Sequence, residues 1–126
     1  MDPFNKPKIL IIDDESICID SVSIMLLGTE YNLLTASSGS QGVKVAESTP
    51  DLSLILLDIM MDDLNGIEVL KILKNNDNLK NIPVVLQTGS YGNTLVNEAL
   101  ALGAKSCLYK PFKKDSLLET IHKYKL

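Results

Sequence analysis

Five side chains with complementary chemistry follow short segments spread along the chain: Asp13, Asp14, Asp58, Thr88 and Lys110. Three carboxylates brought into one crevice repel one another. A divalent cation that prefers hard oxygen ligands relieves this repulsion, and Mg²⁺ is the usual choice where a phosphate supplies further ligands. A lysine adds a compact positive charge, and a threonine adds a hydroxyl donor. Together these groups are typical of a phosphoryl-transfer site with a carboxylate nucleophile.

Each of these residues alone has an ordinary structural interpretation. An aspartate after a strand is often a turn or helix-capping residue, and a single lysine is usually a solvated surface residue. The functional interpretation therefore depends on all five lying at the carboxyl ends of strands. By contrast, Asp62 and Asp63 are expected to be solvated loop carboxylates, and His122 is expected to lie far from the strand ends.

The elements that must position these residues alternate regularly along the chain. Apolar runs predict strands, and apolar residues at helical spacing predict the helices between them. We expect strands at 8–12, 32–36, 52–57, 83–88 and 106–109, with helices at 15–27, 38–49, 66–75 and around 95–102 and 117–121. This alternation predicts an α/β fold: a doubly wound, five-stranded parallel sheet with helices on both faces. Ligands bind such sheets beyond the carboxyl ends of the strands.

Length and composition limit the classes of protein. A chain of 126 residues favours one domain over 1–126, with its core at about 8–124. Its net charge of −4 and its lack of Arg argue against direct nucleic-acid binding. It has neither a membrane-length apolar segment nor the long apolar stretch of a signal peptide, so we expect a cytoplasmic protein that does not bind membranes. Two cysteines do not make a disulfide framework, and we expect reduced thiols.

The ordered set of motifs resembles the CheY-like receiver domains of two-component response regulators. The resemblance covers nearly the whole chain. Its motifs are Ile11–Glu15, Leu56–Met61 with Gly66, Thr88–Gly89 and Lys110–Phe112. It implies a flavodoxin-like (βα)5 sheet with strand order 2-1-3-4-5.

The resemblance also implies a signalling function. Asp58 would accept a phosphoryl group from the phosphohistidine of a sensor histidine kinase or a histidine phosphotransfer protein. Lys110 would pair with the phosphoryl oxygens, and Thr88 would move to hydrogen-bond them. The chain would then be a phosphoacceptor that assists only its own phosphotransfer and dephosphorylation, and not an enzyme acting on a separate substrate.

A metal site and an output surface follow from the same resemblance. Asp13 and Asp14 would hold Mg²⁺ together with Asp58 and the backbone carbonyl of Met60. An output partner or domain would bind the lysine-containing surface at 93–124, and a homodimer is an open alternative. The resemblance also implies a cis peptide bond between Lys110 and Pro111, which a proline permits.

Two positions depart from the commonest pattern of this family. Asp62 stands where a proline usually follows the methionine, which removes a backbone constraint and adds a carboxylate. Cys107 stands where receivers usually carry a switching aromatic residue, and strand alternation places Tyr109 on the same face. Whether Tyr109 replaces that aromatic is left open by the sequence.

Three alternative functions follow from these residues. A pseudo-receiver would keep the fold and act only in docking or dimerisation, and the two departures are its only support. A haloacid-dehalogenase-like phosphohydrolase requires Asp-x-Asp after the first strand, whereas Asp13 and Asp14 are adjacent. A nucleotide- or flavin-binding module is disfavoured because no glycine-rich phosphate loop follows the first strand.

Overall fold

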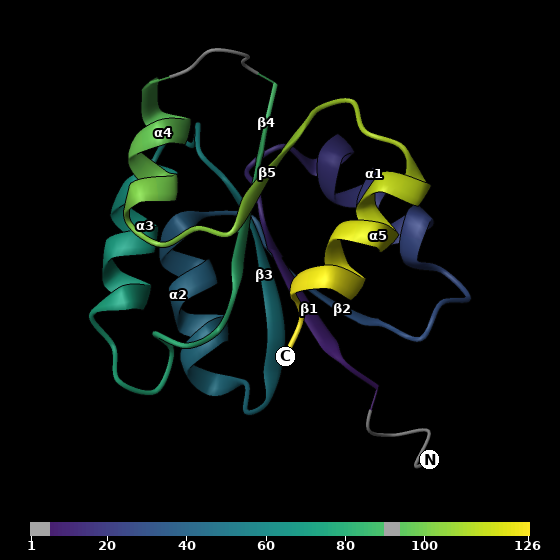
Figure 1. Ribbon diagram of the computed structural model, residues 1–126, viewed down its shortest axis with the longest axis horizontal. Coiled ribbons are helices and arrows are strands. Elements are labelled where there is room, and N and C mark those ends of the chain that lie inside the picture. Colours follow the sequence, from purple (N-terminus) through teal and green to yellow (C-terminus); the bar gives the residue numbers. More distant parts are fainter. Residues whose placement is uncertain (1–5, 90–93) are drawn as a thin grey trace.

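Five strands and five helices alternate along the chain, as the sequence predicts (Figure 1). The computed structural model describes residues 6–89 and 94–126. The strands are β1 (Lys8–Ile12), β2 (Asn32–Ala36), β3 (Leu52–Asp58), β4 (Val84–Thr88) and β5 (Ser106–Tyr109). The helices are α1 (Ser16–Leu26), α2 (Gly39–Ser48), α3 (Gly66–Lys74), α4 (Thr94–Ala101) and α5 (Lys114–Tyr124). Within the described residues, every helix is too short or too polar to cross a bilayer.

The strands form one parallel sheet in the order β2-β1-β3-β4-β5, which confirms the predicted fold. Successive side chains of a strand point to opposite faces, so each buried strand contributes to two cores. In β1, for example, Leu10 and Ile12 belong to one hydrophobic cluster and Ile9 and Ile11 to the other.

Helices cover both faces of the sheet (Figure 1). Helices α2, α3 and α4 pack on the cluster that contains Leu10, and α1 and α5 pack on the cluster that contains Ile9. The expected inward positions of α3, which are Val69, Leu70 and Leu73, are all fully buried. The two layers leave the carboxyl edge of the sheet free of helices.

The register of the strands aligns their carboxyl ends. Ile12 pairs with Leu57 across β1 and β3, so the residues that follow them, Asp13 and Asp58, lie side by side at the edge of the sheet. Asp58 in turn pairs with Gln87 at the end of β4. Parallel pairing therefore brings together residues that are far apart in the sequence.

Two strand boundaries differ slightly from the prediction, and the helix ends differ by up to three residues. Strand β3 includes Asp58, and β4 begins at Val84, one residue after Pro83. Proline has no N–H to donate to a neighbouring strand. Its carbonyl oxygen still accepts a hydrogen bond from the Ile55 N–H at 2.9 Å, so Pro83 aligns β4 without belonging to it.

Candidate functional site

Asp13 is a fully buried carboxylate directly after β1. Its Oδ1 accepts the backbone N–H of Glu15 at 2.9 Å. Its Oδ2 accepts Lys110 Nζ at 2.7 Å and Gln87 Nε2 at 3.2 Å. A buried charge needs such partners, and these contacts hold the carboxylate in one orientation.

Asp58 lies beside Asp13 and is 3% exposed. Its Oδ1 accepts the Met60 N–H at 3.2 Å, and its Oδ2 lies 3.7 Å from Lys110 Nζ. Burial, and then the negative charge of Asp13, raise the pKa of Asp58 from its usual value to about 7, although Lys110 opposes the shift. Asp58 is therefore a buried carboxylate whose negative charge the site compensates only in part.

Lys110 is the cation that joins the acidic residues. Its Nζ lies 2.7 Å from Asp13, 3.7 Å from Asp58 and 3.9 Å from Glu15 Oε1. Burial alone would lower the pKa of Lys110, but its hydrogen bond to Asp13 and the charge of Asp58 raise it overall. The ammonium group is thus held in its charged form at the rim of the site.

Three of the predicted carboxylates converge. Asp13, Asp14 and Asp58 each offer an oxygen, and these oxygens lie within 4.8 Å of one another. Asp14 is exposed, and its Oδ2 accepts the backbone N–H of Asp62 at 3.2 Å. A proline at position 62 could not donate this hydrogen bond. This departure from the family pattern therefore ties the loop after β3 to the acidic cluster.

An open cleft of about 210 Å³ lies over this edge of the sheet. Thr88 is buried at the end of β4 and lines the cleft together with Asp58 and Lys110. Met60 also lines the cleft and is 55% exposed. The structure therefore brings Asp58, Thr88 and Lys110 together at one cleft, and Asp13 and Asp14 lie beside it in the acidic cluster with Asp58. The metal-binding role of the Met60 carbonyl stays a prediction.

The turn after β3 depends on a glycine. A Cβ on Gly66 would lie 2.6 Å from Ile59 Cα and 2.7 Å from the carbonyl oxygen of Asp58. The Gly66 N–H also donates to the Ile59 oxygen at 2.8 Å. This close backbone approach holds the start of α3 against the strand end that carries Asp58.

Asp63 is an exposed loop carboxylate, as expected, but it also caps a helix. Its carboxylate accepts the backbone N–H of Gly39 at 3.0 Å, the N–H of Ser40 at 3.1 Å and the Ser40 hydroxyl at 2.9 Å. The backbone donors of Ser40 and Gly39 hold the pKa of Asp63 well below its usual value. Asp63 thus caps the first turn of α2, and both Asp62 and Asp63 are exposed.

Sequence reasoning missed two polar residues of the site, Glu15 and Gln87. The signal for Glu15 is its place after Asp13 and Asp14. The signal for Gln87 is an amide inside an otherwise apolar strand, on the same face as Val85. His122 lies in the last turn of α5 and lines no part of the cleft.

Cys107 and Tyr109 lie at the far edge of the sheet from β2. Cys107 packs against the cluster under α2, α3 and α4, and burial raises the pKa of its thiol while a hydrogen bond with Tyr109 lowers it. The two side chains are therefore neighbours, as strand alternation predicts. Both cysteines are free thiols, and the peptide bond between Lys110 and Pro111 is cis.

Known proteins share this sequence pattern and fold. Residues 9–122 match the family model of the response regulator receiver domain. The two-component response regulator ORR5 of Oryza sativa subsp. japonica is 32% identical over 111 residues, covering 88% of this chain and 83% of the relative. The cell cycle response regulator CtrA of Brucella ovis is 31% identical over 115 residues, covering 91% of this chain but only 48% of CtrA.

Solved structures agree with these relatives. The chemotaxis protein CheY4 of Vibrio cholerae superposes with a TM-score of 0.87 at 27% identity, covering 94% of this chain and 98% of that one. The receiver domain of a sensor histidine kinase from Pseudomonas aeruginosa, which holds a magnesium ion in its active-site cleft, has a TM-score of 0.86 at 23% identity. It covers 94% of this chain and 96% of that chain, and it shares the fold.

Proposed function

The chain belongs to the response regulator receiver family of two-component signalling, and from this premise we propose that Asp58 is its phosphoacceptor. The observation that carries the proposal is the under-neutralised carboxylate of Asp58, which lines an open cleft beside Lys110 and Thr88. The donor would be a phosphohistidine of a sensor histidine kinase or a histidine phosphotransfer protein. The product is an aspartyl phosphate that changes which partner the domain binds.

The chemistry is an in-line displacement at phosphorus. A carboxylate oxygen of Asp58 forms the new P–O bond, the P–N bond to histidine breaks, and the imidazole leaves with the electron pair. Lys110 Nζ is 3.7 Å from Asp58 and would neutralise the phosphoryl oxygens. The Thr88 hydroxyl would donate a hydrogen bond to one of these oxygens and so register the modification.

The acidic cluster fits Mg²⁺. Asp13, Asp14 and Asp58 supply hard oxygen donors within 4.8 Å of one another, and their mutual repulsion favours a cation. We propose that these three carboxylates hold the ion, with the Met60 carbonyl as a fourth protein ligand. When bound, Mg²⁺ supplies positive charge to the transferring phosphoryl group. The Mg²⁺ in the cleft of the Pseudomonas aeruginosa receiver is a parallel case in a distant protein of the same fold.

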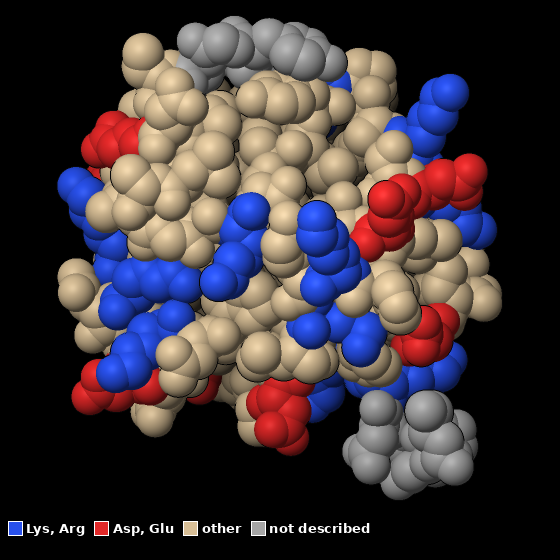
Figure 2. All heavy atoms as spheres, viewed as in Figure 1, with Lys and Arg blue, Asp and Glu red and all other residues tan. Residues whose placement is uncertain are grey.

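The output surface is proposed at residues 93–124, of which residue 93 lies outside the described residues. Figure 2 shows lysine side chains spread over the face that includes β5 and α5, with acidic side chains between them. A face with this mixture of charges suits a partner protein with complementary charge or a second receiver. Cys107 and Tyr109 lie on β5 within this surface, so a signal passing through β5 would meet this pair.

The test is intact-mass spectrometry after incubation with acetyl phosphate, with Mg²⁺ or with EDTA. We expect one phosphoryl adduct that requires Mg²⁺, is absent from Asp58→Asn and persists in Asp62→Asn. The second variant is a matched control because it removes an exposed carboxylate from the same loop.

An adduct that survives in Asp58→Asn would place the phosphoacceptor elsewhere. If no adduct forms, beryllofluoride, which mimics a phosphoryl group without a donor, separates donor selectivity from lack of function. Failure to bind beryllofluoride would overturn the proposal in favour of a docking module.

A further inference from the structure

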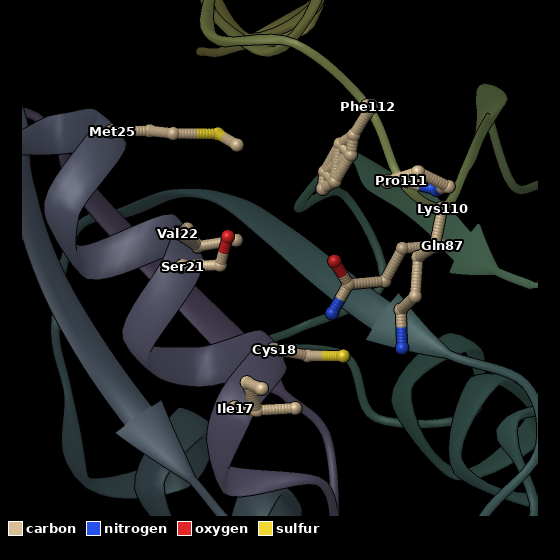
Figure 3. Close-up of a pocket in the computed structure, with 9 residues that line it drawn as sticks. All are labelled: Ile17, Cys18, Ser21, Val22, Met25, Gln87, Lys110, Pro111 and Phe112. Atoms are coloured by element: carbon tan, nitrogen blue, oxygen red, sulfur yellow. The ribbon is translucent and has the colours of Figure 1, made fainter.

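A second cavity, of about 170 Å³, lies between α1 and the segment after β5 (Figure 3). Lys110 lines both this cavity and the cleft over Asp58. The walls are mainly apolar: Val22 and Met25 of α1 form one side, and Phe112 forms the other. Gln87, from the end of β4, lines the same cavity. Nothing in phosphoryl transfer at Asp58 requires this second space.

Gln87 brings an unsatisfied polar atom to the cavity. Its side chain is fully buried, and its Nε2 donates to Asp13 Oδ2 at 3.2 Å. This bond fixes the amide orientation, because the reverse orientation would set two acceptor oxygens against each other. Oε1 therefore turns toward α1, as Figure 3 shows, and no donor among the described residues reaches it. An unmade hydrogen bond of this kind is costly, so the atom favours an external donor.

The shape and lining of the cavity select the class of donor. A cavity of about 150 Å³ lined by apolar side chains can hold benzene, and the volume here is about 170 Å³. The Met25 thioether and the Phe112 ring face each other across the space, and both groups make favourable contacts with aromatic rings (Figure 3). The positive charge of Lys110 is already paired with Asp13. The cavity therefore favours a neutral ligand over a charged one.

We propose that this cavity, which we call the Gln87 pocket, binds a small neutral aromatic molecule with one O–H or N–H donor, such as a phenol or an indole. Oε1 is buried just beneath the cavity wall, so the donor would bond to it after a small shift of the side chains that line the cavity. The ring would pack between Met25 and Phe112. Because Lys110 forms one wall, the ligand would touch the lysine that pairs with Asp13 and Asp58. The site is distinct from the phosphoacceptor, and ligand binding requires no phosphorylation.

The test is a titration of the metal-free protein with phenol or toluene, followed by ¹H–¹⁵N NMR. The two probes have nearly the same shape, but only phenol has a donor. We expect shifts at α1, Gln87 and Phe112, with phenol binding about fivefold or more tighter than toluene, since one hydrogen bond distinguishes them. In Gln87→Met, which keeps the length of the side chain but removes the acceptor, we expect this preference to disappear.

A second variant tests the location independently of Gln87. Ser21 is exposed on α1 and lines the cavity, so Ser21→Phe should fill its mouth while preserving the fold. We expect it to abolish the shifts from both probes. Equal affinity for phenol and toluene in the unchanged protein would overturn the proposal. It would indicate an apolar pocket without a hydrogen-bonding role for Gln87, such as one that receives an apolar side chain of a partner protein. Shifts confined to other surfaces, or unaffected by Ser21→Phe, would also overturn it.

Discussion

At the scale of single residues, the site contains more negative charge than it neutralises. Lys110 makes its shortest ion pair with Asp13, at 2.7 Å, and lies 1 Å farther from Asp58, at 3.7 Å. Gln87 adds a second donor to Asp13, while the Met60 N–H donates to Asp58. This unequal sharing leaves the buried charge of Asp58 only partly compensated, so a cation or phosphorylation there would be favourable.

This imbalance predicts a pH-dependent stability. The folded pKa of Asp58 is raised from 3.8 to about 7, so the folded metal-free protein binds this proton more tightly than the unfolded chain does. The resulting stabilisation is present below 3.8 and is lost as the pH rises through about 7. Asp58→Asn does not titrate, so in EDTA its stability relative to the unchanged protein should increase across this window by up to about 4 kcal/mol, since one pKa unit corresponds to about 1.4 kcal/mol.

Urea unfolding at several pH values between 4 and 8 measures this difference. Titrating groups that do not interact with Asp58 are common to both proteins and cancel in the comparison. A difference that stays constant over the whole range would show that Asp58 is ionised throughout.

The convergence of Asp13, Asp58 and Lys110 could be predicted because strand ends in a parallel sheet meet at one edge. The role of Asp63 could not. Its partners, Gly39 and Ser40, are 24 and 23 residues away, and no local pattern indicates which helix start the loop will meet. Gln87 was missed for a similar reason, because its partner Asp13 is 74 residues away.

At the scale of secondary-structure elements, the loop between β3 and α3 contacts both the acidic site and the start of α2. It carries Asp58 at one end, and through Asp63 it caps α2. A carboxylate at a helix start satisfies backbone donors and interacts favourably with the helix dipole. The loop is therefore held by α2 as well as by its own helix.

Asp63→Ala should destabilise the protein by about 1 kcal/mol, because the first turn of α2 loses its capping carboxylate. Asp62→Ala is the matched control and should change stability little, since its side chain is exposed. Because the pKa of Asp63 is lowered on folding, the effect should shrink as the pH falls and the carboxylate is protonated. Equal losses in both variants at neutral pH would contradict the capping role.

Gly66→Ala should cost more than loss of this cap, about 2 kcal/mol or more, because overpacking against backbone forces the chain to move. The added Cβ would meet Ile59 and Asp58 backbone atoms at 2.6 and 2.7 Å. Gly89→Ala is the control, since a Cβ there has no neighbour within 4 Å. Denaturant unfolding of both variants measures the contrast, and similar stabilities would argue against a tight approach at Gly66.

Helices and strands were easier to predict than their contacts. Uninterrupted apolar runs such as Leu54–Leu57 identify strands buried on both faces, and the structure places strands at all five predicted segments. The exact start of β4 after Pro83 depends on which backbone groups pair with β3. That pairing is known only once the register of the two strands is known. The same holds for the close approach at Gly66.

At the scale of the whole molecule, the carboxyl edge of the sheet lies between the two hydrophobic layers and borders two cavities. Lys110 follows β5 and lines both the Asp58 cleft and the Gln87 pocket. The layer under α1 and α5 borders the pocket, whereas Cys107 packs in the opposite layer. Because Lys110 also pairs with Asp58, a change in charge at Asp58 would act on a residue shared by the cleft and the pocket.

Mg²⁺ should stabilise the whole fold, because it would bind carboxylates that come together only in the folded chain. At ten times its dissociation constant, a ligand specific for the folded state adds about 1.4 kcal/mol, which for a domain of this size corresponds to about 3–6 °C in Tm. Thermal unfolding at pH 8, in EDTA and over a series of Mg²⁺ concentrations, measures the shift.

Two variants locate the ion. Asp14→Asn should strongly reduce the Tm shift while leaving the core intact, because Asp14 is exposed. Asp77→Asn removes an exposed carboxylate outside the cluster and should keep the full shift. If Mg²⁺ raised the Tm of both variants equally, its effect would come from general charge screening, and the three carboxylates would not form its binding site.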